Sequence, residues 1–361
     1  MKVLFDDSIF LQQRFGGISK YFLELINHMD HTAVEPTIFA PIFQCEYIQN
    51  LKPHTNCISH IRKPDMLPRS VASVINRGLS ITLGTDFDVV HETYFAKNPI
   101  LSKSNVPRVI TVYDLIHEIY ASDFGLDKTS SRKKSAIERS DHIIAISENT
   151  KNDLINYYDV SEEKISTVYL GVDQTDNNQI GAKLGFDYIL YVGERGGYKN
   201  FCVLLEAYAS SDYLKSNFKL IAFGGGKFTA VERSKIDHLG CDADKVIQMA
   251  GNDEILSQVY LDAAVFVYPS RYEGFGLPPL EAMRRGCPVV VANSGSIPEV
   301  VGDAGSYFDP SIADELVQQL EQVLNDSEFR QTLIDRGMVR SGLFSWNRCA
   351  KQTLEVYGDV L

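Results

Sequence analysis

The sequence contains little that would suit the chain to a membrane, a disulfide scaffold or a nucleic acid. No apolar run reaches the roughly 18 residues that a membrane-spanning helix requires, and the opening MKVLFDDSIF is too short for a signal peptide. The six cysteines form no C-x-x-C pair, so neither a metal knuckle nor a disulfide framework is expected. A net charge of −12 argues against a surface that binds duplex nucleic acid. We therefore expect a reduced, cytoplasmic location.

Short apolar runs alternate with helical periodicity along the whole chain, which is typical of parallel sheets with crossover helices. Helices are predicted over 17–29, where apolar residues recur at helical spacing, and after Ser147, a predicted N-cap. The predicted strands of the first half are 2–6, 36–41, 87–92, 108–114, 142–147 and 165–170. Those of the second half are 188–194, 218–226, 245–251, 264–270, 287–293 and 304–309.

A polar, amide-rich segment over 171–187 interrupts this alternation and has the composition of a linker. A chain of 361 residues is also too long for one ordinary core. The sequence therefore predicts an α/β protein of two doubly wound, Rossmann-like domains that face a cleft. Its N-terminal domain is predicted over 1–172, the linker over 173–186 and the C-terminal domain over 187–340. In such sheets ligands bind beyond the carboxyl ends of the strands.

The segment 271–300 carries the clearest chemistry. Directly after an apolar strand the chain turns through Gly274 and Gly276, and a helix is predicted to begin near Leu277, followed by two prolines. The first-turn N–H groups of such a helix form a site for anions and hydroxyls. Glu273 lies before this turn and Glu281 lies within the helix, so both carboxylates can reach one ligand seated at the helix start. The hydroxyls of a sugar nucleotide are suitable partners for them.

The stretch YEGFGLPPLEAMRRGCPVVVANSGSIPEVVGDAG resembles the E-x7-E signature of the retaining glycosyltransferases of family 4. QRFGGISKY, DHIIAIS, YLGVD and YVGERGGYKN are similar to further motifs of that family, in the same order. The resemblance covers nearly the whole chain. It implies the GT-B fold, an acceptor-binding N-terminal domain and a donor-binding C-terminal domain. It also implies that a C-terminal helix, expected over 341–361, packs back on the N-terminal domain.

The resemblance further implies the roles of individual residues. Glu281 would hold the ribose hydroxyls of the nucleotide, while Glu273 and nearby amides would hold the donor sugar. The implied catalytic residues are Glu273, Arg195, Lys199, Asp114 and His117. The implied donor-binding residues are Glu281, Gly274, Phe275, Gly276, Leu277, Gly16, Gly17, Tyr113 and Gly193.

Two cations are expected to stabilise the leaving nucleoside diphosphate, because charge develops there as the glycosidic bond breaks. They are Arg195 and Lys199. The family's arginine usually follows the strand-end glycine directly, whereas here Glu194 stands at that position and Arg195 comes next. Which cation reaches the phosphates is therefore left open.

A second departure concerns the family's His-Asp pair at the end of the fourth N-terminal strand, where this chain has Tyr113 and Asp114. The donor-sugar contact could then come from Tyr113, Asp114 or His117. His91 is a fourth candidate, although a lone histidine is more often a packed or capping residue.

No metal or cofactor is expected. The acidic pairs at Asp86–Asp88 and Asp242–Asp244 are interpreted as turn and cap residues rather than metal ligands. No acid stands where a covalent nucleophile is expected, so the hypothesis is front-face attack with retention, in which the leaving phosphate helps to deprotonate the acceptor hydroxyl.

The predicted activity is transfer of a hexose from a nucleotide diphosphate sugar to a glycan or lipid-linked glycan, in surface polysaccharide biosynthesis. UDP-glucose is the first predicted donor and GDP-mannose the second. The basic runs SRKK, at 131–134, and IRKP, at 61–64, are interpreted as solvated faces, with docking on the inner face of an anionic membrane as the alternative. The rival functions are a non-catalytic sugar-nucleotide-binding protein and a sugar-nucleotide epimerase.

Overall fold

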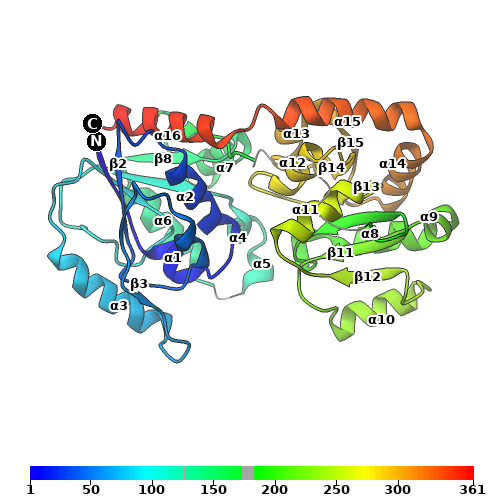
Figure 1. Cartoon of the computed structure of the whole chain (residues 1–361), viewed down its shortest axis with the longest axis horizontal. Coiled ribbons are helices and arrows are strands. Elements are labelled where there is room, and N and C mark those ends of the chain that lie inside the picture. The colour runs from blue at the N-terminus through cyan, green and yellow to red at the C-terminus, as the bar shows by residue number, and fades with distance from the viewer. Residues whose placement is uncertain (126, 173–182) are drawn as a thin grey trace. The chain divides into compact units, whose positions relative to one another are not determined.

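The computed structural model describes residues 1–125, 127–172 and 183–361 and divides into two compact units. Unit 1 comprises Met1–Gly171 together with Trp346–Leu361, and unit 2 comprises Val172–Ser345. Each unit contains one parallel sheet that carries its core, so the predicted α/β architecture of two doubly wound domains is confirmed (Figure 1). Most of the predicted linker, residues 173–182, lies outside the described residues.

The main sheet of unit 1 has seven strands in the order β4-β2-β1-β6-β7-β8-β9, and every neighbouring pair is parallel. The six strands predicted for this half are all present. β4 was not predicted, nor were β3 and β5, because they are only two or three residues long, and the exposed side chains of β5 and at the start of β4 break the apolar pattern. The strands are β1 Lys2–Phe5, β2 Glu35–Phe39, β3 Ile42–Phe43, β4 Asn56–Ile58, β5 Ile61–Arg62, β6 Val89–Glu92, β7 Arg108–Val112, β8 His142–Ala145 and β9 Ile165–Thr167.

The helices of unit 1 include both predicted ones. α2 covers Gly17–Asn27, and Ser147 caps α7 by accepting a hydrogen bond from the backbone N–H of Thr150 at 3.0 Å. The others are α1 Ser8–Gln12, α3 Arg69–Leu79, α4 Ile116–Ile119, α5 Ala121–Phe124, α6 Thr129–Arg139 and α16 Trp346–Asp359, with α7 at Glu148–Tyr158. Short 3-10 turns lie at Glu46–Asn50, Ser80–Thr82 and Glu162–Lys164.

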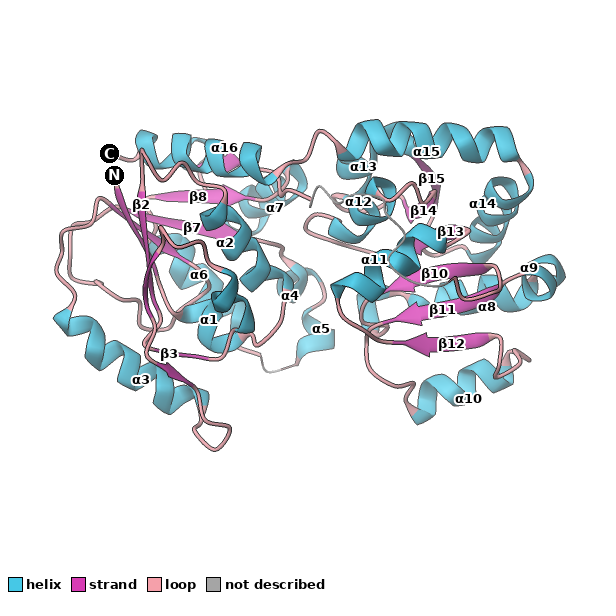
Figure 2. Ribbon diagram, viewed as in Figure 1, coloured by secondary structure: helices cyan, strands magenta, loops and turns pink. Residues whose placement is uncertain are grey.

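The sheet of unit 2 has six parallel strands in the order β12-β11-β10-β13-β14-β15, all of them predicted (Figure 2). The strands are β10 Tyr188–Val192, β11 Lys219–Phe223, β12 Val246–Met249, β13 Val265–Tyr268, β14 Val289–Ala292 and β15 Gly305–Phe308. The helices are α8 Phe201–Ser210, α9 Asp212–Asn217, α10 Ala230–His238, α11 Asp253–Asp262, α12 Leu277–Arg284, α13 Ile297–Val301, α14 Ala313–Asn325 and α15 Ser327–Ser341, and 3-10 turns lie at Gly197–Lys199 and Gly302–Ala304.

The C-terminal helix α16 belongs to unit 1, where it lies beside α2 and β8, as the fold prediction expected (Figure 1). It begins at Trp346 rather than 341, because α15 continues to Ser341. Trp346 packs against Tyr21 of α2 with ring centroids 6.2 Å apart. The hydroxyl of Tyr357 lies 2.6 Å from Nδ1 of His91 on β6, so aromatic and hydrogen-bonding contacts together attach the helix.

His91 is a core residue, which corrects its candidacy as a sugar contact. It is fully buried against Phe5 and Phe22, and both ring nitrogens have partners: Nδ1 meets Tyr357, and Nε2 lies 2.9 Å from Oγ1 of Thr111. Burial lowers the pKa of His91 to about 3 because the charged imidazolium would lose its hydration. The packed alternative for this histidine is therefore the correct one.

The basic run at 131–134 is not a uniform solvated face. Arg132 and Lys134 are exposed, but Lys133 on α6 is 1% exposed. Its ammonium donates to Oε2 of Glu118 and to the carbonyl of Asp114, both at 2.7 Å. One of the three cations of this run therefore ties α6 to the loop after β7. Over 1–125, 127–172 and 183–361, the structure contains no helix that combines the length and the apolar character needed to cross a membrane.

We expect the buried neutral His91 to make the protein sensitive to acid. In the unfolded chain this histidine takes up a proton below pH 6.5, whereas in the fold it stays neutral down to about pH 3, so falling pH favours unfolding over that window. Relative to His91→Gln, the wild type should lose about 1.4 kcal/mol of unfolding free energy per pH unit between pH 6.5 and 4.

Denaturant unfolding of both proteins across that range measures this difference. Other titrating groups are common to the two proteins and cancel. If the unfolding free energy of the wild type does not fall relative to that of His91→Gln as the pH falls, the result would contradict a buried neutral His91.

Candidate functional site

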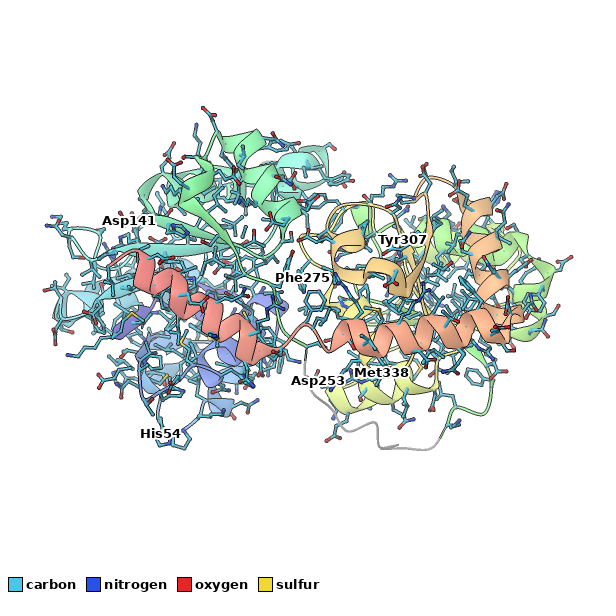
Figure 3. The ribbon with its side chains drawn as sticks, turned by 90° about the horizontal axis from the view of Figure 1, so that it is seen from above. His54, Asp141, Asp253, Phe275, Tyr307 and Met338 are labelled. Atoms are coloured by element: carbon cyan, nitrogen blue, oxygen red, sulfur yellow. The ribbon has the colours of Figure 1, made fainter. Side chains whose placement is uncertain are left out.

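The loop between β13 and α12 presents the backbone of the predicted motif. The hydroxyl of Ser296 lies within hydrogen-bond distance of the carbonyl oxygens of Glu273 at 2.9 Å and Phe275 at 2.6 Å, so one buried side chain bridges both sides of the turn. Phe275, labelled in Figure 3, packs edge-on against Phe344 with centroids 5.8 Å apart. Gly276 has φ 123°, a conformation that favours glycine, and serves as the N-cap of α12 without a side-chain cap. The helix begins at Leu277, as predicted.

Glu273 and Lys199 form a close ion pair at the carboxyl ends of the strands. Lys199 Nζ lies 2.7 Å from Oε1 of Glu273, and the two side chains are 21% and 10% exposed. The ammonium also lies near the rings of Tyr198 and Tyr268, 5.1 and 5.9 Å from their centroids. Burial, reinforced by the carboxylate of Glu273, raises the pKa of Tyr268 well above its usual value, so the phenol stays protonated. The residues predicted to hold the sugar and the diphosphate are thus in direct contact.

Glu281 is the fifth residue of α12 and is partly buried. The hydroxyl of Tyr260, on α11, lies 3.3 Å from its Oε2. Burial and the charge of Glu281 raise the pKa of this tyrosine well above its usual value, so it remains a donor. Arg285 is fixed alongside, because its Nε donates to Ser257 at 2.7 Å and its Nη1 to the carbonyl of Glu281 at 3.2 Å. The carboxylate is therefore oriented by a neighbour that sequence reasoning did not identify.

Arg195 is placed differently from its predicted role at the diphosphate. Its side chain is buried, and its Nε donates to Oε1 of Glu232 at 2.6 Å. Nη1 donates to the carbonyl of Gly224 at 2.9 Å, and Nη2 donates to those of Gly225 and Gly226, both at 3.1 Å. Its guanidinium also stacks 4.8 Å from the ring centroid of Phe228. Arg195 therefore fixes the glycine loop after β11, and contact with a phosphate would require it to exchange these partners.

The glycines at the ends of β10 and β11 adopt conformations that other residues rarely take. Gly193 has φ 127°, and Gly224, Gly225 and Gly226 have φ 87°, 62° and 69°. A Cβ at Gly225 would lie 2.6 Å from Nη1 of Arg195 and 2.9 Å from the carbonyl oxygen of Gly193. The two strand-end loops consequently pack so closely that only glycine fits at position 225. The sequence marked this segment as a strand-end turn but not its contact with Arg195.

In unit 1 the predicted glycines lie at the start of α2. Gly16 is its N-cap and Gly17 its first residue. The carbonyl of Gly16 accepts a hydrogen bond from the hydroxyl of Ser19 at 2.9 Å, and the side chain of Gln13 accepts one from the backbone of Ser19 at 3.0 Å. The approach of Gly16 and Gly17 to a phosphate remains a prediction.

Tyr113, Asp114 and His117 follow β7 but occupy different surroundings. Tyr113 is buried, its hydroxyl donates to the carbonyl of Thr93 at 3.2 Å, and burial raises its pKa well above the usual value. Asp114 accepts a hydrogen bond from the backbone of Ile116 at 3.1 Å. His117 lines a cavity of about 740 Å³ within unit 1. Of these three, His117 is thus placed to meet a small molecule inside unit 1.

The acidic pair at Asp86–Asp88 is engaged locally. Asp86 pairs with the ammonium of Lys2, and Asp88 accepts a hydrogen bond from the backbone N–H of Lys2 at 2.7 Å. These carboxylates position the start of β1, which agrees with their interpretation as turn and cap residues.

Two models of known families match the chain. Residues 172–340 match glycosyl transferases group 1, and residues 15–176 match glycosyltransferase family 4. Together they extend from residue 15 to residue 340.

The chain is also similar to curated bacterial proteins. It is 49% identical over 105 residues to the O-antigen chain mannosyltransferase B of Escherichia coli, a match covering 29% of this chain and 28% of that protein. It is 27% identical over 278 residues to the serotype-specific mannosyltransferase WbdA of the same organism, covering 71% of this chain and 34% of the relative. The matched segments thus span about a third or less of the length of these relatives.

Among solved structures, the sucrose-phosphate synthase of Thermosynechococcus elongatus superposes with a TM-score of 0.77 over 99% of this chain and 98% of that one. The two sequences are 19% identical, so this likeness bears on the fold alone. It confirms the GT-B architecture that the sequence predicted.

The packing around Gly225 predicts a difference between two adjacent substitutions. Both Gly225→Ala and Gly226→Ala place a side chain at positive φ, which costs about 1 kcal/mol. A methyl at 226 meets no other group within 4 Å, whereas a methyl at 225 displaces Arg195 and the carbonyl of Gly193. Gly225→Ala should therefore lower the free energy of unfolding by about 1–3 kcal/mol more than Gly226→Ala does.

Denaturant unfolding of the two variants tests this packing, with Gly226→Ala as the matched control. Equal losses would show that Arg195 does not hold the loop as described.

Proposed function

The chain is a glycosyltransferase of family 4, and we propose that it transfers mannose from GDP-mannose to a glycan acceptor, with retention of the anomeric configuration and without a metal. The observation that carries this proposal is the contact between Glu273 and Lys199 at the start of α12. It brings the carboxylate that we propose binds the sugar and the cation that we propose binds the phosphates to one point. Surface polysaccharide assembly is the proposed setting, because the relatives include an O-antigen chain mannosyltransferase.

The choice of mannose follows from the sequence relatives. Both E. coli proteins compared above are named mannosyltransferases. This favours the second of the two predicted donors, GDP-mannose, over UDP-glucose. The sucrose-phosphate synthase is too distant in sequence to bear on the choice.

Donor binding in unit 2 would proceed by an exchange of partners. Without ligand, Glu273 neutralises Lys199 at 2.7 Å. The diphosphate brings two or more negative charges and would attract the ammonium more strongly than a single carboxylate does. Lys199 would then turn to the phosphates, and the released Glu273 would accept hydrogen bonds from the hydroxyls of the sugar. Lys199 would thus bind the phosphates while Glu273 binds the sugar.

The helix start and Glu281 would complete the donor site. Pro278 and Pro279 carry no N–H, so the backbone N–H groups of Gly276 and Leu277 would supply the donors at the start of α12, where the helix dipole also favours the diphosphate. Glu281 would accept the ribose hydroxyls, with Tyr260 keeping its carboxylate in place. As the glycosidic bond breaks, negative charge grows on the leaving diphosphate, and Lys199 with these amides would stabilise it more in the transition state than in the ground state.

Retention is proposed to occur by attack on the same face from which the diphosphate leaves. The acceptor hydroxyl would form its bond to the anomeric carbon as the bond to the phosphate oxygen breaks. Its proton would pass to that oxygen, which becomes more basic as it takes the bonding electron pair. Ser296 holds the backbone carbonyl of Glu273, so the carboxylate, once Lys199 has turned to the phosphates, is positioned to orient hydroxyls.

Replacement of Glu281 tests the donor site. We expect GDP to bind more tightly than UDP in the presence of EDTA, and Glu281→Gln to weaken the binding of GDP about tenfold or more, because a charge-assisted hydrogen bond is replaced by a neutral one. Isothermal calorimetry of both nucleotides measures these affinities. Glu328→Gln, at an exposed position on α15, is the matched control and should bind as the wild type does.

Tighter binding of UDP would contradict the proposed donor and restore the first predicted one. Binding of GDP that Glu281→Gln leaves unchanged would contradict the proposed position of the ribose.

A further inference from the structure

The cavity in unit 1 lies at the carboxyl end of the parallel sheet. Its walls come from α1, which follows β1, from the loop after β6 that contains Tyr94–Asn98, and from His117, which follows β7. α3 and the start of α6 close the remaining sides. In doubly wound sheets this is the edge at which ligands bind. A volume of about 740 Å³ is large enough for one or two sugar rings.

The charge of this cavity is opposite to that of the chain. The chain has a net charge of −12, yet four cations line the cavity, namely Arg69 and Arg77 from α3, Lys97 after β6 and Arg132 on α6. None of these four forms an ion pair with a carboxylate in the part of the chain that the structure describes.

The two carboxylates in the lining are already engaged. Asp7 is buried and accepts a hydrogen bond from Asn76 at 2.7 Å, and burial raises its pKa. Asp127 lies 3.1 Å from Nε2 of His117. Four cations against two carboxylates leave the lining with an excess of positive charge, an arrangement that favours an anionic ligand.

Two buried atoms of the lining lack hydrogen-bond partners. Nη1 of Arg77 and Nδ1 of His117 are both inaccessible and unpaired. The other end of each group is fixed: Nη2 of Arg77 donates to Ser102 at 2.7 Å, and Nε2 of His117 faces Asp127. Buried polar atoms are rarely left unpaired in native structures, so each points to an absent partner. Arg77 can only donate, so an oxygen of an anion is a suitable partner for it.

We propose that this cavity binds an acidic sugar of the acceptor glycan, with its phosphate or carboxylate at Arg77 and Arg132. The proposal deepens the proposed function, since it names the chemical class of the acceptor. A guanidinium recognises either anion through paired N–H donors, so the two sources share one chemistry.

Three sugars that differ only at carbon 6 test this assignment, namely glucose 6-phosphate, glucuronate and glucose. Each is titrated by calorimetry into the full chain, once alone and once with the donor site saturated with GDP. At least one of the two anions should bind tenfold or more tightly than glucose in both series. The stronger of them identifies the source of the negative charge.

Substitutions in the cavity supply the second arm. Arg132→Gln and Arg77→Gln should each weaken binding of the preferred anion at least fivefold and leave the affinity for GDP unchanged. Lys134→Gln is the matched control, because it removes an exposed cation two residues further along α6 that does not line the cavity. Arg132 is itself exposed, so its replacement leaves the core intact.

Anions that bind no better than glucose, or that bind equally well to Arg132→Gln and to the wild type, would overturn the proposal. Failure of GDP to bind would contradict the proposed donor instead. The titrations without nucleotide would still show whether the cavity binds an acidic sugar.

Discussion

The parallel direction of every strand in the two main sheets is the constraint on which the rest of the molecule depends. Because parallel strands end at one edge, the loops that follow them converge there, although they lie far apart in the sequence. In unit 2 this edge brings Lys199, which follows β10, within 2.7 Å of Glu273, which follows β13. In unit 1 it collects α1, the loop after β6 and His117 around one cavity.

Charge pairing at the edge of unit 2 would prepare the proposed donor site for an anionic ligand. Lys199 is held by Glu273 and Arg195 by Glu232, at 2.7 and 2.6 Å. A buried cation without a partner would be costly, and each carboxylate removes that cost until a ligand takes its place. The two pairs differ in what surrounds them. Arg195 also donates to three glycine carbonyls, so Lys199 is the cation that a diphosphate can recruit at lower cost.

Local sequence patterns predicted the fold and the backbone of the donor site. Apolar runs marked every long strand, and the glycines and prolines predicted a helix that begins near Leu277, which is the first residue of α12. Side-chain partnerships were harder to predict, because they join residues far apart in the chain. No sequence feature near Arg195 indicates its contact with Glu232, and none near Glu281 indicates its contact with Tyr260. Likewise, His91 shows the strand-end position of a ligand-binding histidine, and only packing against α16 reveals that it is buried.

The sequence analysis did not predict the cavity of unit 1, for a related reason. α3 was not predicted, because several of its apolar side chains, among them Val71 and Val74, are exposed instead of forming a core face. Without that helix, Arg69 and Arg77 appear as scattered surface charges. The fold converts them into one wall of a positively charged cavity.

The central claim is that the chain binds GDP-mannose and transfers its sugar with retention, and slow hydrolysis of the donor tests it most directly. The protein is incubated with GDP-mannose in the presence of EDTA, and proton NMR follows the released sugar before its anomers equilibrate. The account predicts that GDP appears together with α-mannose, the anomer of the donor. Initial release of β-mannose, or no release of GDP, would contradict it.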